Sequence, residues 1–113
     1  MNLLMKEFGD NPFIGYWHDF GHIQRKHNLL ILNHEQFLRR MSSHLIGGHV
    51  NDVKWPARDH QVPLLGGVVP FERLLPFFPH GVPLVWELSS RVSSEDIRAA
   101  RKLWMEKFPQ TLA

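Results

Sequence analysis

Short apolar runs alternate with amphipathic stretches along this chain. The apolar runs cover residues 12–17, 45–50 and 83–88. Their length and the Pro, Gly and polar residues around them are typical of buried strands. Apolar side chains recur at helical spacing in three other stretches, at about residues 34–42, 70–78 and 94–108. Strands that alternate with helices in this way predict an α/β fold, with a parallel sheet covered by helices.

Capping residues indicate where these helices begin. Asn33 stands three residues before Gln36, a spacing typical of a capped first turn. Pro70 suits the first turn of the second helix. Ser93 and Asp96 form a Ser-x-x-Asp pattern ahead of the third.

Three further segments bear on the organisation of the chain. Residues 1–9 have apolar side chains at helical spacing and end in glycine, so we expect the tail of a preceding helix. Residues 23–32 leave two alternatives open, a helical turn or a packed loop. Residues 51–69 form a long connection that is rich in potential ligands, and connections of this length are usually functional or disordered.

Composition narrows the class of protein. The 113 residues are 43% hydrophobic and carry a net charge of +2, which fits one globular domain. The charges are scattered, so no basic stripe indicates nucleic acid or a membrane surface. The absence of cysteine excludes disulfides and thiolate metal sites. No charged leader precedes a long apolar region, and no run approaches the ~18 residues of a membrane helix, so we expect a soluble, cytoplasmic protein.

The candidate chemistry lies where the predicted strands end. Asp19, His49 and Glu87 each lie at or just beyond the end of one of the three apolar runs, at intervals of 30 and 38 positions. In parallel α/β sheets, ligands gather at the carboxyl ends of the strands. Two carboxylates and an imidazole suit Mn²⁺, Mg²⁺, Co²⁺ or Zn²⁺, so a divalent metal ion is the predicted cofactor. The alternative is three ordinary polar residues at strand ends.

Four short motifs in register resemble the C-terminal part of a xylose-isomerase-like TIM barrel. That superfamily comprises sugar-phosphate isomerases and epimerases, together with apurinic endonucleases of the endonuclease IV type. The motifs are Asp19-Phe20-Gly21-His22, His49-Val50-Asn51-Asp52, Asp59 to Gly67 followed by Val69-Pro70-Phe71, and Trp86-Glu87-Leu88-Ser89-Ser90-Arg91. The resemblance implies that residues 12–108 are the last three strand-helix units of a partial (β/α) barrel.

The resemblance also implies roles for individual residues. Asp19, His49 and Glu87 would bind the metal, and Glu87 would also act as a base. The substrate, a sugar or sugar phosphate, would lose a proton next to its carbonyl, pass through an enediolate and be reprotonated. His22 would hydrogen-bond substrate or join a second metal, with a local cap as the alternative.

Three other residues, two from the motifs and Trp55 from the long connection, each have two interpretations. Arg91 would orient an anionic substrate, or is simply solvated. Asp52 would hold the ring of His49 from behind, or caps a turn. Trp55 would stack on a sugar, or packs in the core.

Asp59 and His60 bear on the nuclease branch. There an aspartate and a histidine separated by one residue both bind zinc, whereas here the two are adjacent. Adjacent side chains of an extended segment point to opposite sides. This expectation and the scattered charges both disfavour a metallonuclease that acts on nucleic acid. The remaining histidines are expected to be surface or packing residues: His18, His27, His34, His44 and His80.

The size of the chain sets a last expectation. A closed barrel needs about 200 to 250 residues, and in the family a further glutamate from the preceding strand completes the metal site. We therefore expect either a fragment without its N-terminal barrel portion or a homo-oligomer, because three parallel strands leave both sheet edges open. The alternative functions are a non-catalytic partial barrel that serves as a binding or structural unit, and the metallonuclease.

Overall fold

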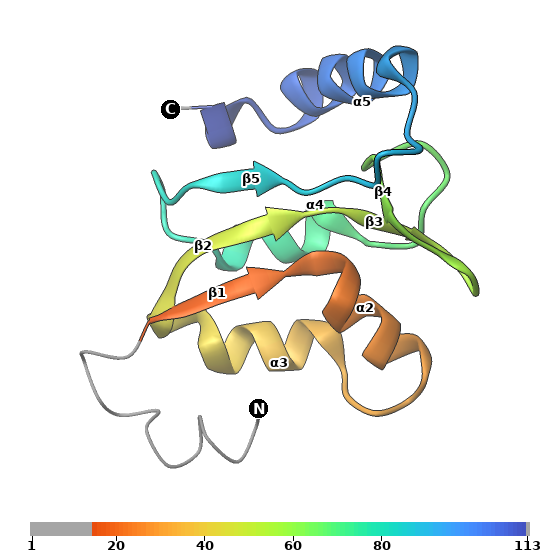
Figure 1. Cartoon of the computed structure of the whole chain (residues 1–113). Coiled ribbons are helices and arrows are strands. Elements are labelled where there is room, and N and C mark those ends of the chain that lie inside the picture. Colours follow the sequence, from red (N-terminus) through yellow and green to blue (C-terminus); the bar gives the residue numbers. More distant parts are fainter. Residues whose placement is uncertain (1–14, 113) are drawn as a thin grey trace.

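The computed structural model describes residues 15–112 and has a three-stranded parallel sheet at its centre (Figure 1). The strands are β1 (Tyr16–Asp19), β2 (Leu45–Val50) and β5 (Leu84–Trp86), in the order β1-β2-β5. Both strand pairs are parallel. The predicted α/β class and parallel sheet are confirmed, and the sheet within these residues is open rather than closed into a barrel.

The helices are α2 (Phe20–Asn28), α3 (His34–Met41), α4 (Phe71–Leu74) and α5 (Ser94–Lys107). Figure 1 shows α3 and α4 on one face of the sheet and α5 beside the β5 edge. Two of the predicted caps are confirmed: the Gln36 amide donates to Asn33 Oδ1 at 2.9 Å, and the Asp96 amide donates to Ser93 Oγ at 3.1 Å. All these helices are too short or too polar to span a membrane.

Several boundaries differ from the predictions. The helix α2 starts directly after β1. Most of segment 23–32, for which two alternatives were left open, is therefore helical. The helix predicted from Pro70 is α only as far as Leu74 and continues as a 3₁₀ turn over Leu75–Phe77. Pro76 lies in that turn and has no amide hydrogen to extend an α-helix. The predicted helix tail 1–9 and residues 12–14 of the first apolar run lie outside the described residues.

The long connection after β2 contains a small antiparallel hairpin that the sequence pattern did not predict. Its strands are β3 (Asp52–Lys54) and β4 (Arg58–Gln61). Both strands are short and charged, so they lack the apolar alternation that identifies a strand.

The two glycines of β2 mark close approaches of neighbouring groups. The Trp17 ring lies over Gly47, where a Cβ atom would clash with it. At Gly48, a Cβ atom would lie 2.9 Å from the His18 carbonyl oxygen. Neighbouring strands therefore pack here only because β2 has no side chain at these positions.

The two faces of the sheet differ. One face packs with the helices into a core that includes Phe20, Phe71 and Trp104. The other face exposes Trp17, Ile46 and Val85, which are 38%, 54% and 49% accessible. An apolar sheet face open to water is the kind of surface that proteins use for association.

A buried chain of hydrogen bonds links β1 to α2 and α3. Tyr16 Oη lies 3.0 Å from His18 Nδ1, His18 Nε2 lies 2.8 Å from His34 Nε2, and His34 Nδ1 lies 2.7 Å from Gln24 Oε1. The Gln24 side-chain amide then donates to Asn28 Oδ1 at 2.9 Å. Because Gln24 Oε1 only accepts, His34 Nδ1 must carry a hydrogen, and each upstream group then donates in the same direction. Both histidines are neutral packing residues in this arrangement.

Burial changes the pKa values of this chain. It lowers the pKa of His34 to about 3, with a smaller contribution from the nearby His27. It also lowers the pKa of His18 well below the usual value, with His34 adding to the effect. Protonation of His34 would place its Nε2–H against the Nε2–H of His18 and would put a positive charge in a buried site.

Stability should therefore fall in acid. A histidine whose pKa is depressed in the folded state stabilises the protein above its unfolded pKa of 6.5, and this stabilisation is lost as pH falls toward the folded value of about 3. We expect His34 alone to lower the free energy of unfolding by about 2 kcal/mol between pH 7 and pH 5. Urea unfolding at both pH values measures this.

The matched variants are His34→Gln and His80→Gln. H34Q should reduce the pH dependence, since glutamine does not titrate, and H80Q is the control at an exposed position. An H34Q protein with the wild-type pH dependence would contradict the assignment.

Candidate metal centre

The parallel register brings three sequence-predicted residues to one edge of the sheet. Asp19 ends β1 and pairs with His49 of β2, which pairs in turn with Val85 of β5. Glu87 follows β5, and its amide donates to the Val50 carbonyl at 3.1 Å. The ligand atoms of Asp19, His49 and Glu87 all lie within 4.8 Å of one another.

The imidazole of His49 lies between the two carboxylates. Its Nδ1 is 3.2 Å from Glu87 Oε2 and 4.0 Å from Asp19 Oδ2. The three side chains are 28% to 44% exposed, so an ion or a small substrate can reach them. Two carboxylate oxygens and one imidazole nitrogen in this arrangement fit a divalent cation by the chemistry of the donor set.

Helix capping orients the Asp19 carboxylate. Its Oδ1 accepts a hydrogen bond from the His22 amide at 2.9 Å and caps α2, which leaves Oδ2 on the side of His49. The three-residue interval between Asp19 and His22 is thus the geometry of an N-cap. The His22 side chain is exposed in the first turn of α2.

A second histidine, from the β3–β4 hairpin, lies against the cluster formed by Asp19, His49 and Glu87. His60 Nε2 lies 3.1 Å from Glu87 Oε1, and His60 Nδ1 lies 3.3 Å from Asp59 Oδ1. The expectation that Asp59 and His60 point to opposite sides is therefore wrong. His60 has a φ of 52°, a left-handed conformation that breaks the strand alternation and turns its ring back toward Asp59.

The charges around His60 form an alternating row. Asp59 Oδ2 pairs with Arg25 Nη1 at 2.9 Å, on the far side from the histidine. Partial burial works to lower the pKa of His60, but hydrogen bonds and charge from Asp59 and Glu87 outweigh it and raise the pKa. A proton on His60 and a cation bound by Glu87 would therefore compete for the same carboxylate.

Asp52 caps a turn and does not contact the ring of His49 from behind. Its buried carboxylate accepts hydrogen bonds from the Val53 amide at 2.8 Å and the Val69 amide at 2.9 Å. Burial raises its pKa, and these backbone hydrogen bonds partly offset the rise. Asp52 thus closes the loop between β4 and α4, the turn-capping alternative, and does not orient His49.

The other predicted substrate residues lie apart from the metal ligands. Trp55 is in the turn of the β3–β4 hairpin and is 37% exposed. Arg91 follows β5 and lines a polar pocket with Arg58 and Ser89. Arg58 could not be predicted from the sequence, because a single charged residue in a long connection has no distinguishing pattern.

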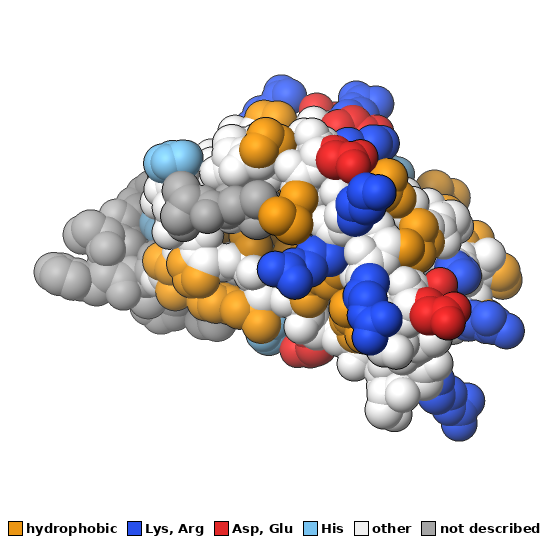
Figure 2. Space-filling view, turned by 90° about the horizontal axis from the view of Figure 1, so that it is seen from above, with side chains coloured by type: hydrophobic (Ala, Val, Ile, Leu, Met, Phe, Trp, Pro, Cys, Tyr) orange, Lys and Arg blue, Asp and Glu red, His pale blue; other side chains and the backbone are white. Residues whose placement is uncertain are grey.

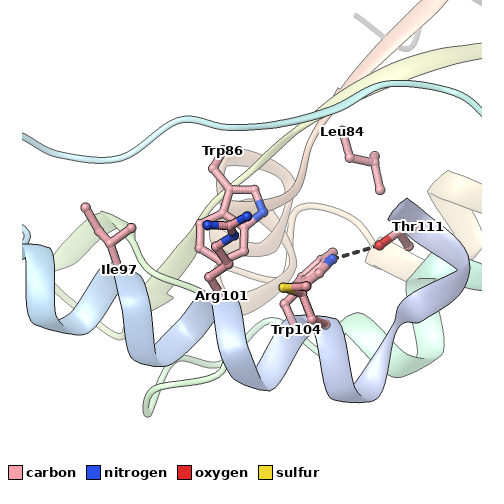
Figure 3. Close-up of a pocket in the computed structure, with 7 residues that line it drawn as sticks. Leu84, Trp86, Ile97, Arg101, Trp104 and Thr111 are labelled. Carbon is pink, nitrogen blue, oxygen red and sulfur yellow. Dashed lines mark hydrogen bonds between the residues drawn. The ribbon is translucent and has the colours of Figure 1, made fainter. Parts of the chain in front are cut away.

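One apolar pocket lies away from Asp19, His49 and Glu87. It has a volume of about 470 Å³ and lies between β5 and α5, with Trp86 and Trp104 in its wall (Figure 3). The Trp104 indole N–H donates to Thr111 Oγ1 at 2.8 Å and closes one end. Among its lining residues only Arg101 is charged, so this pocket holds no acid-base pair.

Protein-family models, curated proteins and solved structures gave no match to this chain.

The loop closed by Asp52 makes a testable contrast between two adjacent glycines. A Cβ atom at Gly67 would clash with the Asp52 carboxylate, whereas Gly66 has open space but a φ of +89°. We expect Gly67→Ala to cost about 2 to 3 kcal/mol through overpacking and lost backbone hydrogen bonds. Gly66→Ala should cost about 1 kcal/mol through backbone strain alone. Urea unfolding of both variants gives the comparison, and equal losses would show that Asp52 does not hold the loop.

Proposed function

We propose that the protein is a divalent-metal-dependent isomerase or epimerase that acts on a sugar or sugar phosphate by proton transfer next to a carbonyl. The observation that carries the proposal is the convergence of Asp19, His49 and Glu87 within 4.8 Å at the carboxyl ends of three parallel strands. These three residues would hold the ion. When bound, such an ion polarises the substrate carbonyl and makes the neighbouring C–H more acidic.

The chain's own residues supply the proton transfer. Glu87 would accept the proton from the carbon next to the carbonyl and return it to the enediolate. His60 donates toward Glu87 Oε1 across 3.1 Å and so fixes the orientation of that carboxylate. His22, exposed beside the cap of α2, would hydrogen-bond a substrate hydroxyl.

A metallonuclease is a second candidate, and one observation favours it. Asp59 and His60 lie on the same side, next to Glu87, which provides more ligands than the strand ends alone. The distribution of positive charge on the surface does not favour a nuclease. Figure 2 shows Lys and Arg side chains interspersed with hydrophobic and acidic ones, with no continuous basic stripe on the face that is seen.

A non-catalytic binding or structural unit is the third candidate. The open sheet edges and the exposed Trp17, Ile46 and Val85 favour association with further strands, either in a second copy or in another part of a barrel.

Metal binding is the first test. Asp19→Asn keeps an oxygen that can cap α2 but removes the anionic ligand, so the fold should survive while the affinity for Mn²⁺ or Co²⁺ falls about tenfold or more. Asp96→Asn, on the exposed first turn of α5, is the matched control and should bind metal like the wild type. Isothermal titration gives both affinities. Absence of metal binding at millimolar concentration would refute the proposal.

Proton exchange is the second test. With Mn²⁺ in deuterated water, a panel of ketoses and ketose phosphates should gain deuterium next to the carbonyl, and Glu87→Gln should abolish the gain because it removes the base. Metal binding without exchange would favour the non-catalytic unit. Cleavage of abasic DNA without exchange would favour the nuclease.

A further inference from the structure

A polar pocket lies next to the cluster, on the side of the hairpin. Its volume is about 490 Å³. It is lined by Ala57, Arg58, Asp59, Gln61, Ser89 and Arg91. Unlike the pocket beside α5, this one contains two arginines, a hydroxyl and an amide.

The charge of this pocket is unbalanced. Asp59 is the one acidic residue in its lining, and Arg25 already pairs with it at 2.9 Å. Neither Arg58 nor Arg91 forms a side-chain ion pair with any residue from 15 to 112. Two positive charges are therefore left without a partner in a concave surface, where low-dielectric walls strengthen attraction for an anion.

A backbone hydrogen bond joins the two segments that carry these arginines. The Ser89 amide donates to the His60 carbonyl at 2.8 Å and ties the segment after β5 to β4. Ser89 Oγ accepts from the Arg91 amide at 3.2 Å, which leaves the hydroxyl hydrogen free to donate. Arg58 begins β4, two residues before His60.

The same hydrogen bond between Ser89 and His60 places the pocket beside the cluster. His60 lies 3.1 Å from Glu87, and Ser89 is two residues beyond Glu87. A molecule whose carbonyl end lies at Asp19, His49 and Glu87 can therefore extend toward the arginines. Guanidinium groups match the paired oxygens of a phosphate, whereas a neutral hydroxyl group offers them no charge.

We propose that Arg58, Arg91 and the Ser89 hydroxyl form a phosphate site, and that the natural substrate of the cluster is a phosphate monoester of a sugar rather than a neutral sugar. The phosphate site stands on its own geometry, and the identity of the substrate rests on the proposed function.

Phosphate binding tests the site without metal or turnover. In the presence of EDTA, inorganic phosphate titrated into the full chain should shift the amide NMR signals of residues 57–61 and 89–91. The double variant Arg58→Ala, Arg91→Ala should weaken this binding about tenfold or more. The control Arg98→Ala, Arg101→Ala removes the same charge from α5 and should change it less than about twofold, which separates local recognition from net charge. Absence of phosphate binding, or equal losses in both double variants, would overturn the site.

A second comparison separates this inference from the proposed function. If the exchange reaction occurs, R58A/R91A should raise KM for a ketose phosphate and leave KM for the unphosphorylated ketose unchanged. Equal effects on both ketoses would overturn the substrate assignment even if the enzyme is active. Phosphate binding that depends on the arginines, in a protein without metal binding or exchange, would keep the site and refute the isomerase. Tighter binding of an abasic oligonucleotide than of a sugar phosphate would assign the pocket to nucleic acid instead.

Discussion

The parallel pairing of β1, β2 and β5 determines where the candidate chemistry lies. The carboxyl ends of parallel strands lie at the same edge of the sheet, so the polar residues at the ends of neighbouring strands lie side by side. Asp19 pairs directly with His49, and the amide of Glu87 continues the ladder to Val50. A shift of one residue in any strand would turn its ligand to the opposite face of the sheet and disperse the cluster.

The cluster gathers negative charge, and its neighbours compensate for it. Glu87 has a histidine on each of its oxygens, His49 at 3.2 Å and His60 at 3.1 Å. Asp19 gives one oxygen to the N-terminus of α2, where the amide groups favour negative charge, and Asp59 is paired with Arg25. The carboxylates of Glu87, Asp19 and Asp59 are thus each held by a partner on a helix or a strand. A bound cation would add positive charge beside Glu87, in competition with a proton on His60.

The two faces of the sheet have opposite physical characters. On the helical face, a one-way chain of hydrogen bonds runs from Tyr16 through His18 and His34 and pairs both ring nitrogens of each histidine. On the other face, Trp17, Ile46 and Val85 are open to solvent beside the candidate ligands. The closed face explains how so small a sheet is stable, and the open face is where further strands or a second copy would pack.

The local features of this protein follow from short patterns in its sequence. Apolar runs predicted all three strands of the parallel sheet, and Asn33 and Ser93 predicted two helix starts, because periodicity and capping act over a few residues. Candidate ligands at strand ends were predictable too, since Asp19, His49 and Glu87 each lie at or just beyond the end of an apolar run. The hairpin was not predictable, because its charged strands carry no apolar alternation. The positions of Asp52, His60 and Arg58 depend instead on the tertiary structure. Asp52 is buried under a loop, a left-handed backbone turns His60 toward Glu87, and the folding of the hairpin brings Arg58 into the same pocket lining as Arg91. Each of these depends on contacts between residues far apart in the chain, and local patterns contain no information about such contacts.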